Sequence, residues 1–177
     1  ATLAEAVETT PGKTAYYQSV TLTDLQPATK YVYRVGDGGH HWSEWNHFDT
    51  ASDKEGPFSF IYVGDAQTDV LSLWSRVIRD AFRHKADARF ILHAGDLINY
   101  ANNDNEWAEW FEAAGWINRV IPILAVPGNH EHFIPQGSKE RQLSHLWKPQ
   151  FEYPKNGLQA HQDTNSYIDY QGVRLVA

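Results

Sequence analysis

Three short blocks of this 177-residue sequence pair a glycine with residues that bind metal ions or move protons. They are Gly-Asp at 64–65, Gly-Asp at 95–96 and Gly-Asn-His at 128–130, and each follows an apolar run. In open α/β sheets, ligands bind outside the carboxyl ends of the strands. We therefore expect the three blocks to lie near a common point, where each glycine permits a tight turn and a close approach of the backbone.

The chemistry of such a cluster follows from its charge. Carboxylates gathered at one point repel each other, which raises at least one pKa unless a cation neutralises them. Oxygen-rich ligation suits a hard metal ion. The order of residue types favours two metal ions that share a ligand, with Asp96 as the bridge, Asp65 on one side and Asn129 on the other. Two-metal clamps of this kind serve the hydrolysis of phosphate esters.

A β-α-β-α-β segment positions these blocks. The apolar runs FSFIYV, ARFILHA and IPILAV predict three buried strands, and Pro127-Gly128 ends the third. The 3.6-residue periodicity of VLSLWSRVIRDAF and NEWAEWFEAAGWI predicts the two intervening helices. This order implies a parallel sheet. The expected buried helical positions are Val70, Leu71, Trp74, Val77, Ile78 and Ala81 in the first helix and Trp107, Trp110, Phe111 and Ala114 in the second.

The segments on either side of this unit predict mostly β structure. The first 50 residues suggest strands in YYQSVTL, TKYVYRV and WSEWNHF, and Tyr31 has the sequence setting of a tyrosine corner in a fibronectin-type sandwich. A polar stretch at 52–57 is a plausible linker, so we expect domains at 1–53 and 57–177. Further along, KERQLSHLW suggests a short helix, and SYIDYQGVRLVA suggests a hairpin that turns at Gln171-Gly172.

The three blocks together resemble the purple acid phosphatases of the calcineurin-like metallophosphoesterase superfamily. The matching segments are GDAQ (64–67), GDLINY (95–100) and GNHE (128–131), after a fibronectin-like β region. The fold that the resemblance implies is α/β. It consists of a truncated fibronectin type III-like β-sandwich followed by the first half of a metallophosphoesterase β-α-β-α-β sandwich.

One substitution places the sequence in the purple branch of this superfamily. The wider superfamily opens with Asp-x-His, but this chain has Gln67 at the His position and a tyrosine, Tyr100, four residues after Asp96. The resemblance implies that Asp65, Asp96, Tyr100 and Asn129 bind two metal ions, Fe(III) plus Zn, Mn or Fe(II). Tyr100 would hold the ferric ion as a phenolate, which would give the purple colour.

The resemblance also assigns two catalytic candidates. His130 would lie near the leaving group as a proton donor or phosphate contact, and Glu131 would orient His130 or a metal-bound water. We expect His93 to pack or bond locally, and His132 is a further candidate for contact with substrate. The remaining six histidines are expected to be solvated: His40, His41, His47, His84, His145 and His161.

The implied function is hydrolysis of phosphate monoesters by attack of metal-bound hydroxide. A phosphodiesterase or nucleotide pyrophosphatase on the same scaffold is an alternative, as is a non-catalytic carbohydrate- or protein-binding derivative. The family's later histidine motifs, VxxH and GHxH, do not occur in these residues. We therefore expect this chain to be a fragment that is inactive alone, from a secreted or periplasmic enzyme whose signal peptide is not in this chain.

The composition of the chain excludes several classes of partner and of chemistry. Fifteen Lys and Arg against 22 Asp and Glu give a formal charge of −7, which argues against a nucleic-acid partner. No run approaches the roughly 20 apolar residues of a membrane helix. The absence of cysteine removes disulfides, zinc-thiolate sites and thiol nucleophiles. The expected partner is a phosphorylated small molecule, and the oligomeric state is left open.

Overall fold

A three-stranded parallel sheet forms the centre of the fold. The computed structural model describes residues 5–161 and 164–177. The sheet has the order β5 (Ile61–Val63), β6 (Ile91–His93) and β7 (Ile123–Ala125), and both pairs are parallel. The predicted β-α-β-α-β order is therefore confirmed, although each strand is only three residues long.

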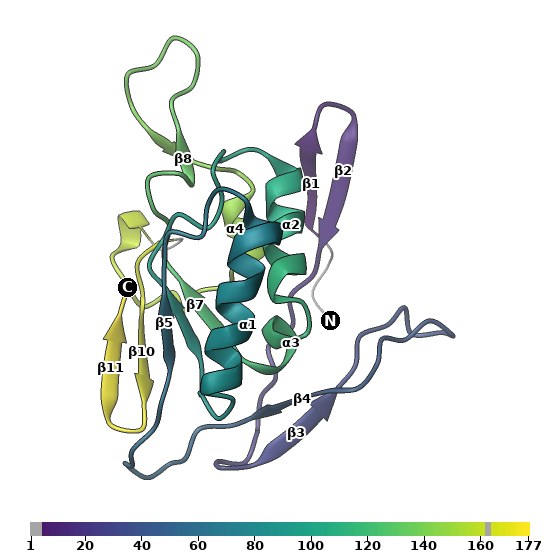
Figure 1. The fold of residues 1–177 in the computed structure, drawn as a ribbon, viewed down its shortest axis with the longest axis vertical. Helices are drawn as coiled ribbons and strands as arrows, with labels where there is room; N and C mark the ends of the chain where they lie inside the picture. The colour runs from purple at the N-terminus through teal and green to yellow at the C-terminus, as the bar shows by residue number, and fades with distance from the viewer. Residues whose placement is uncertain (1–4, 162–163) are drawn as a thin grey trace.

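Helices cover one face of this sheet (Figure 1). A π-helical turn, η1 (Val70–Trp74), leads into α1 (Ser75–His84), and α2 (Asp104–Ala114) and the short α3 (Ile117–Val120) follow the second strand. Burial confirms most of the predicted stripes, but Leu71, Val77 and Phe111 are exposed, against the prediction. The buried stripe is therefore narrower than predicted. The core helical residues are Val70, Trp74, Ile78, Trp107, Trp110, Ala113 and Ala114.

A hairpin formed by β10 (Tyr167–Tyr170) and β11 (Val173–Val176) lies on the other side of the sheet. Figure 1 shows this hairpin on the side of the sheet away from α1 and α2. Its turn residues, Gln171 and Gly172, have φ values of 46° and 89°. Positive φ at both positions is what a two-residue type I′ turn requires. The predicted hairpin and its turn are confirmed.

The N-terminal region forms two antiparallel hairpins. β1 (Glu5–Thr10) pairs with β2 (Lys13–Tyr17), and β3 (Lys30–Tyr33) pairs with β4 (Asn46–Asp49). The sequence did not predict β1, and residues 18–22, which were expected to extend the YYQSVTL strand, lie outside any strand.

Tyr31 forms the predicted tyrosine corner. Its hydroxyl accepts a hydrogen bond of 2.8 Å from the backbone N–H of Gln26, five residues upstream. Its ring stacks on Phe48 of the neighbouring strand at a centroid distance of 5.7 Å. The phenol therefore fixes the chain where it enters β3, which is its role in fibronectin-type domains.

The segment after β7 differs from the prediction. β8 (His132–Phe133) pairs with β9 (Gln142–Leu143), and Figure 1 shows the loop after β8 projecting from the molecule. The helix predicted in KERQLSHLW is therefore wrong, because cross-strand pairing overrides the helical propensity of that stretch. Two short helical turns follow, α4 (Trp147–Gln150) and η2 (Gln159–His161).

The polar stretch at 52–57 connects the two halves and is held in place. The Gln171 side chain accepts from the N–H of Ser52 and donates to the carbonyl of Gly56.

A further contact joins β3 to α3, because the hydroxyl of Tyr33 donates to the carbonyl of Arg119 at 2.7 Å. Among the described residues, no helix is long and apolar enough to cross a membrane.

Candidate metal centre

The three predicted blocks lie together at the carboxyl ends of β5, β6 and β7. The backbone N–H of Asp65 donates to the carbonyl of Gly95 at 3.0 Å, and the N–H of Gln67 donates to the carbonyl of Asp96 at 3.1 Å. The N–H of His130 donates to Oδ1 of Asp96 at 2.9 Å. The second block is therefore bonded to both of the others, as the sheet topology requires.

Two glycines allow the second and third blocks to come this close. A Cβ atom at Gly128 would lie 2.5 Å from the backbone nitrogen of Asp96. A Cβ at Gly95 would lie 2.7 Å from the nitrogen of Gly128, and Gly95 has a φ of +89°. Real Cβ atoms do not approach this closely, so no larger residue fits either position without moving a loop.

Both predicted metal-binding aspartates have left-handed backbone conformations. The φ value is 59° at Asp65 and 53° at Asp96. Aspartate tolerates this region better than most residues, but it still carries a backbone cost. The Asp65 carboxylate is further fixed by Gln67, whose Nε2 donates to its Oδ1 at 2.7 Å. Gln67, which occupies the position of the superfamily histidine, thus contacts the first aspartate directly.

Glu131 joins the second and third blocks from inside the molecule. Its side chain is fully buried. Oε1 accepts from the N–H groups of Leu97 at 2.7 Å and Ile98 at 3.3 Å, and Oε2 accepts from those of Asp96 at 2.9 Å and Gly128 at 2.6 Å. These contacts make Glu131 a positioning residue for the backbone of both blocks. This role differs from the predicted one, in which Glu131 orients His130 or a metal-bound water.

Tyr100 lies on the loop that follows the second block. Its side chain is 66% exposed. The carboxylate of Glu106 holds this loop, because its Oε2 accepts from the N–H groups of Asn99 and Tyr100, both at 2.8 Å. Sequence reasoning missed Glu106. The signal was available, since Asn103 caps α2 and Glu106 stands three residues later, the spacing of a capping box.

His130 is half-buried at the wall of a cavity of about 390 Å³. Its Nδ1 lies 2.7 Å from the carbonyl oxygen of Asn99. A carbonyl only accepts, so Nδ1 carries a hydrogen and Nε2 is the nitrogen left for another partner. The cavity is lined by Asn99, Tyr100, Ala101, Asn129, His130, His132, Phe133, Ile134 and Arg141. The six predicted site residues are Asp65, Asp96, Tyr100, Asn129, His130 and Glu131. Three of them, Tyr100, Asn129 and His130, thus line one cavity.

The donor set at this edge fits a hard cation in type but is incomplete in number. Asp65, Asp96 and Asn129 supply oxygen atoms from three adjoining loops, and the Asp65 and Asn129 side chains are exposed. Within residues 5–161 and 164–177, however, no three His, Asp or Glu side chains are grouped closely enough to hold a metal ion. Asp65 and Asp96 also do not line the cavity beside His130.

His93 lies in the core rather than in the site, as predicted. It is 2% exposed, and its ring makes edge contacts with Trp74 and Trp110 at centroid distances of 5.4 and 5.8 Å. Burial lowers its pKa from 6.5 to about 4, against the smaller raising effects of the Gly95 backbone and the Asp96 charge. His93 therefore stays neutral over a wide pH range.

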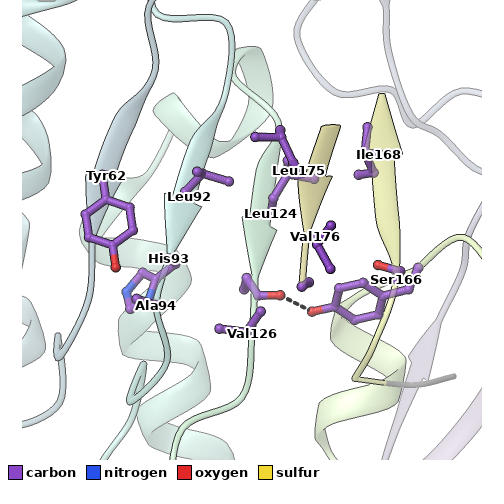
Figure 2. A pocket seen from close by; sticks show the side chains of 13 residues that line it. Tyr62, Leu92, His93, Ala94, Leu124, Val126, Ser166, Ile168, Leu175 and Val176 are labelled. Atoms are coloured by element: carbon purple, nitrogen blue, oxygen red, sulfur yellow. Dashed lines mark hydrogen bonds between the residues drawn. The ribbon is translucent and has the colours of Figure 1, made fainter. Parts of the chain in front are cut away.

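A second cavity, of about 230 Å³, lies between the sheet and the β10–β11 hairpin (Figure 2). Leu92 and Leu124 line it from the sheet, and Ile168 and Val176 line it from the hairpin. At one wall the Tyr153 hydroxyl donates to the carbonyl of Ala125 at 2.6 Å. The pKa of this phenol is raised by burial and, to a lesser extent, by the charge of Glu131. None of the six predicted site residues lines this cavity.

Comparison with known proteins supports the resemblance. Residues 2–50 match the family model "Purple acid Phosphatase, N-terminal domain", of which residues 2–4 lie outside the described structure. Acid phosphatase type 7 of Danio rerio is 35% identical over 120 residues, which are 66% of this chain and 26% of that protein. The chain is purple acid phosphatase-like.

Other relatives agree with this identification. A purple acid phosphatase of Glycine max is 27% identical to this purple acid phosphatase-like chain over 126 residues, 68% of the chain and 27% of the relative. The structure of a purple acid phosphatase from seeds of yellow lupin (Lupinus luteus) matches the fold with a TM-score of 0.71 at 18% identity. That match covers 88% of this chain and 31% of the lupin chain. The chain thus spans about a quarter of the length of the curated relatives that it matches.

Proposed function

We propose that this chain carries part of the active site of a dinuclear-metal phosphoesterase that hydrolyses phosphate monoesters. The observation that supports it most is the meeting of three loops at one sheet edge, with Asp65 and Asp96 both in left-handed conformations. A soluble α/β fold does not need this arrangement for its own stability. The likeness to relatives named acid phosphatases points in the same direction.

In this proposal Asp65 and Tyr100 belong to one metal ion, Asn129 belongs to the other, and Asp96 is shared between them. The pair would be Fe(III) with Zn, Mn or Fe(II), and ligands beyond the described residues would complete the set. Metal ions in such a site supply an activated water and stabilise the charge on the phosphoryl oxygens.

The other residues of the site would orient the His130 ring and hold the backbone of the loops. The Asn99 carbonyl fixes the ring of His130, which leaves Nε2 as the atom that would hold a proton for the leaving oxygen. The buried carboxylate of Glu131 fixes the backbone of the loop that carries this histidine, at Gly128, and of the neighbouring loop, at Leu97. The substrate would be a phosphorylated small molecule. By the same resemblance the enzyme would act in a secreted or periplasmic setting.

The test is metal content and hydrolysis of an aryl phosphate by the full-length protein after substitution of the shared ligand. Asp96→Asn removes one anionic oxygen while keeping the size of the side chain, and we expect it to lower metal stoichiometry and abolish hydrolysis. Asp53→Asn, an exposed position in the linker, is the matched control and leaves both unchanged. In the iron-loaded protein, Tyr100→Phe should remove visible absorption. Full metal content in the Asp96→Asn protein would refute the bridging role.

A further inference from the structure

The β8–β9 hairpin contributes a cation to the cavity beside His130. Arg141, the residue before β9, is exposed and lines this cavity, and its Nη1 donates to the carbonyl of Asn129 at 3.3 Å. Within the described part of the chain no carboxylate forms an ion pair with Arg141. One backbone carbonyl uses little of a guanidinium's five-donor fork. The remaining donors are available to an anion in the cavity.

His132 on β8 lines the same wall. Its Nδ1 lies 2.7 Å from the carbonyl oxygen of Gly128, so Nδ1 carries a hydrogen, as in His130. No described residue bonds its Nε2. Because Nδ1 carries the hydrogen, Nε2 of the neutral ring is an acceptor, so it can take a hydrogen bond from a ligand but cannot give one to an anion.

The same hairpin supplies apolar surface. Phe133 lies half-buried in β8, and Ile134, at the start of the projecting loop, is 56% exposed. Ala101 lines the cavity from the opposite loop. A cavity with an apolar wall and a guanidinium suits a ligand that is both apolar and anionic.

The position of the cavity indicates which part of a substrate it would contact. Asp65 and Asp96 do not line it, whereas Tyr100, Asn129 and His130 do. In the function proposed above, His130 lies at the leaving oxygen. The cavity therefore adjoins two of the proposed metal ligands and includes the His130 side, where the leaving group would lie.

We propose that Arg141 binds an anionic oxygen group, carboxylate or phosphate, on an apolar leaving group that packs against Phe133 and Ile134. This inference rests on the proposed function and adds the substrate class. The preferred substrates are phosphate monoesters of ring-containing alcohols or phenols that bear a second negative charge. Arg141 would then determine specificity, while the reacting atoms lie at the neighbouring loops.

A binding experiment on this chain tests the subsite without metal or turnover. Benzoate, phenylphosphonate and neutral benzamide are titrated at low salt and followed by amide NMR shifts. We expect benzoate and phenylphosphonate to shift residues 132–134 and 141 and to bind about fivefold more tightly than benzamide, the scale of one exposed charge pair. A response to only one of the two anions identifies which oxygen group is recognised.

Arg141→Gln should reduce benzoate binding to the level of benzamide. Lys139→Gln is the matched control, because it removes the same charge from an exposed position of the same hairpin that does not line the cavity. The inference is overturned if the three ligands bind equally, or if the two variants weaken benzoate binding to the same extent. The second result would indicate a general electrostatic field rather than a subsite.

Turnover by the full-length, metal-loaded enzyme separates this inference from the proposed function. The ratio of kcat/KM for 4-carboxyphenyl phosphate to that for phenyl phosphate should fall about fivefold in Arg141→Gln and stay unchanged in Lys139→Gln. If both esters are hydrolysed and the ratio is unaffected, the specificity assignment is wrong while the enzyme assignment stands. If neither ester is hydrolysed, the proposed function fails, and the binding experiment still decides whether the anion subsite exists.

Discussion

Replacing Glu131 by glutamine tests whether its buried carboxylate holds the candidate site together. The side chain accepts four backbone N–H bonds, two at each oxygen, from Asp96, Leu97, Ile98 and Gly128. Glutamine has almost the same shape but only one acceptor oxygen. Whichever way the amide turns, two N–H groups lose their acceptor and meet an NH₂ donor instead.

The expected destabilisation follows from these two groups. An unsatisfied buried N–H costs about 1–3 kcal/mol, so Glu131→Gln should lower the free energy of unfolding by about 2–6 kcal/mol. A domain of this kind is stable by only about 5–15 kcal/mol. For a chain of this length the loss corresponds to a fall in Tm of roughly 5–20 °C.

The assay is denaturant unfolding followed by tryptophan fluorescence, since Trp107, Trp110 and Trp147 are fully buried. Glu140→Gln is the control, because Glu140 is exposed, and it should leave stability within about 0.5 kcal/mol of the parent. Hydrogen exchange adds a local readout, in which the amides of residues 96–98 should lose protection. Equal unfolding midpoints for the two variants, with unchanged exchange at 96–98, would refute the clamp.

Two further predictions concern the same region. Gly128→Ala places a Cβ against the Asp96 backbone and should cost about 1–3 kcal/mol in unfolding free energy and weaken metal binding. Gly56→Ala is the control, because its Cβ would have only one neighbour, at 3.7 Å, and it should leave stability and metal binding unchanged. Equal effects of the two variants would contradict the close approach of Gly128 to the Asp96 backbone. For His93, the folded pKa of about 4 lies below the unfolded value of 6.5, so only the unfolded chain takes up a proton between these values. The free energy of unfolding should therefore fall by about 3 kcal/mol as the pH drops from 6.5 to 4. His93→Phe should remove this pH dependence when unfolding is measured across that range. An unaltered pH dependence in the variant would show that another group causes it.

The parts of the fold that the sequence predicted are those in which burial imposes a pattern. The strand at 88–94 is apolar because both faces of β6 are covered, and the spacing of Trp107 and Trp110 matches one face of α2. The hairpin at Gln171-Gly172 was predictable for a different reason. Its turn needs positive φ, and few residue types supply it. In each case a local requirement determines the residue types.

The parts that were missed depend on distant partners. Residues 139–147 contain good helix formers, but β9 forms because Gln142 and Leu143 pair with Phe133 and His132. Arg141 enters the cavity only through that pairing, twelve residues after Asn129 in the sequence. Glu131 was predicted at the site but with another role, because the sequence does not show that its carboxylate lies inside the molecule, against the backbone of residues 96–98.

The energetics of the three loops bear on why they adopt this arrangement. A left-handed conformation costs an L-residue roughly 1–2 kcal/mol, and Asp65 and Asp96 both adopt it. The four N–H bonds to Glu131 offset that cost, since bonds to a charged acceptor contribute about 1.5–3 kcal/mol each. A fold selected only for stability would gain from relaxed aspartates with the same clamp. The combination of left-handed aspartates and a buried carboxylate that holds their loops supports the proposed ligand site at this edge.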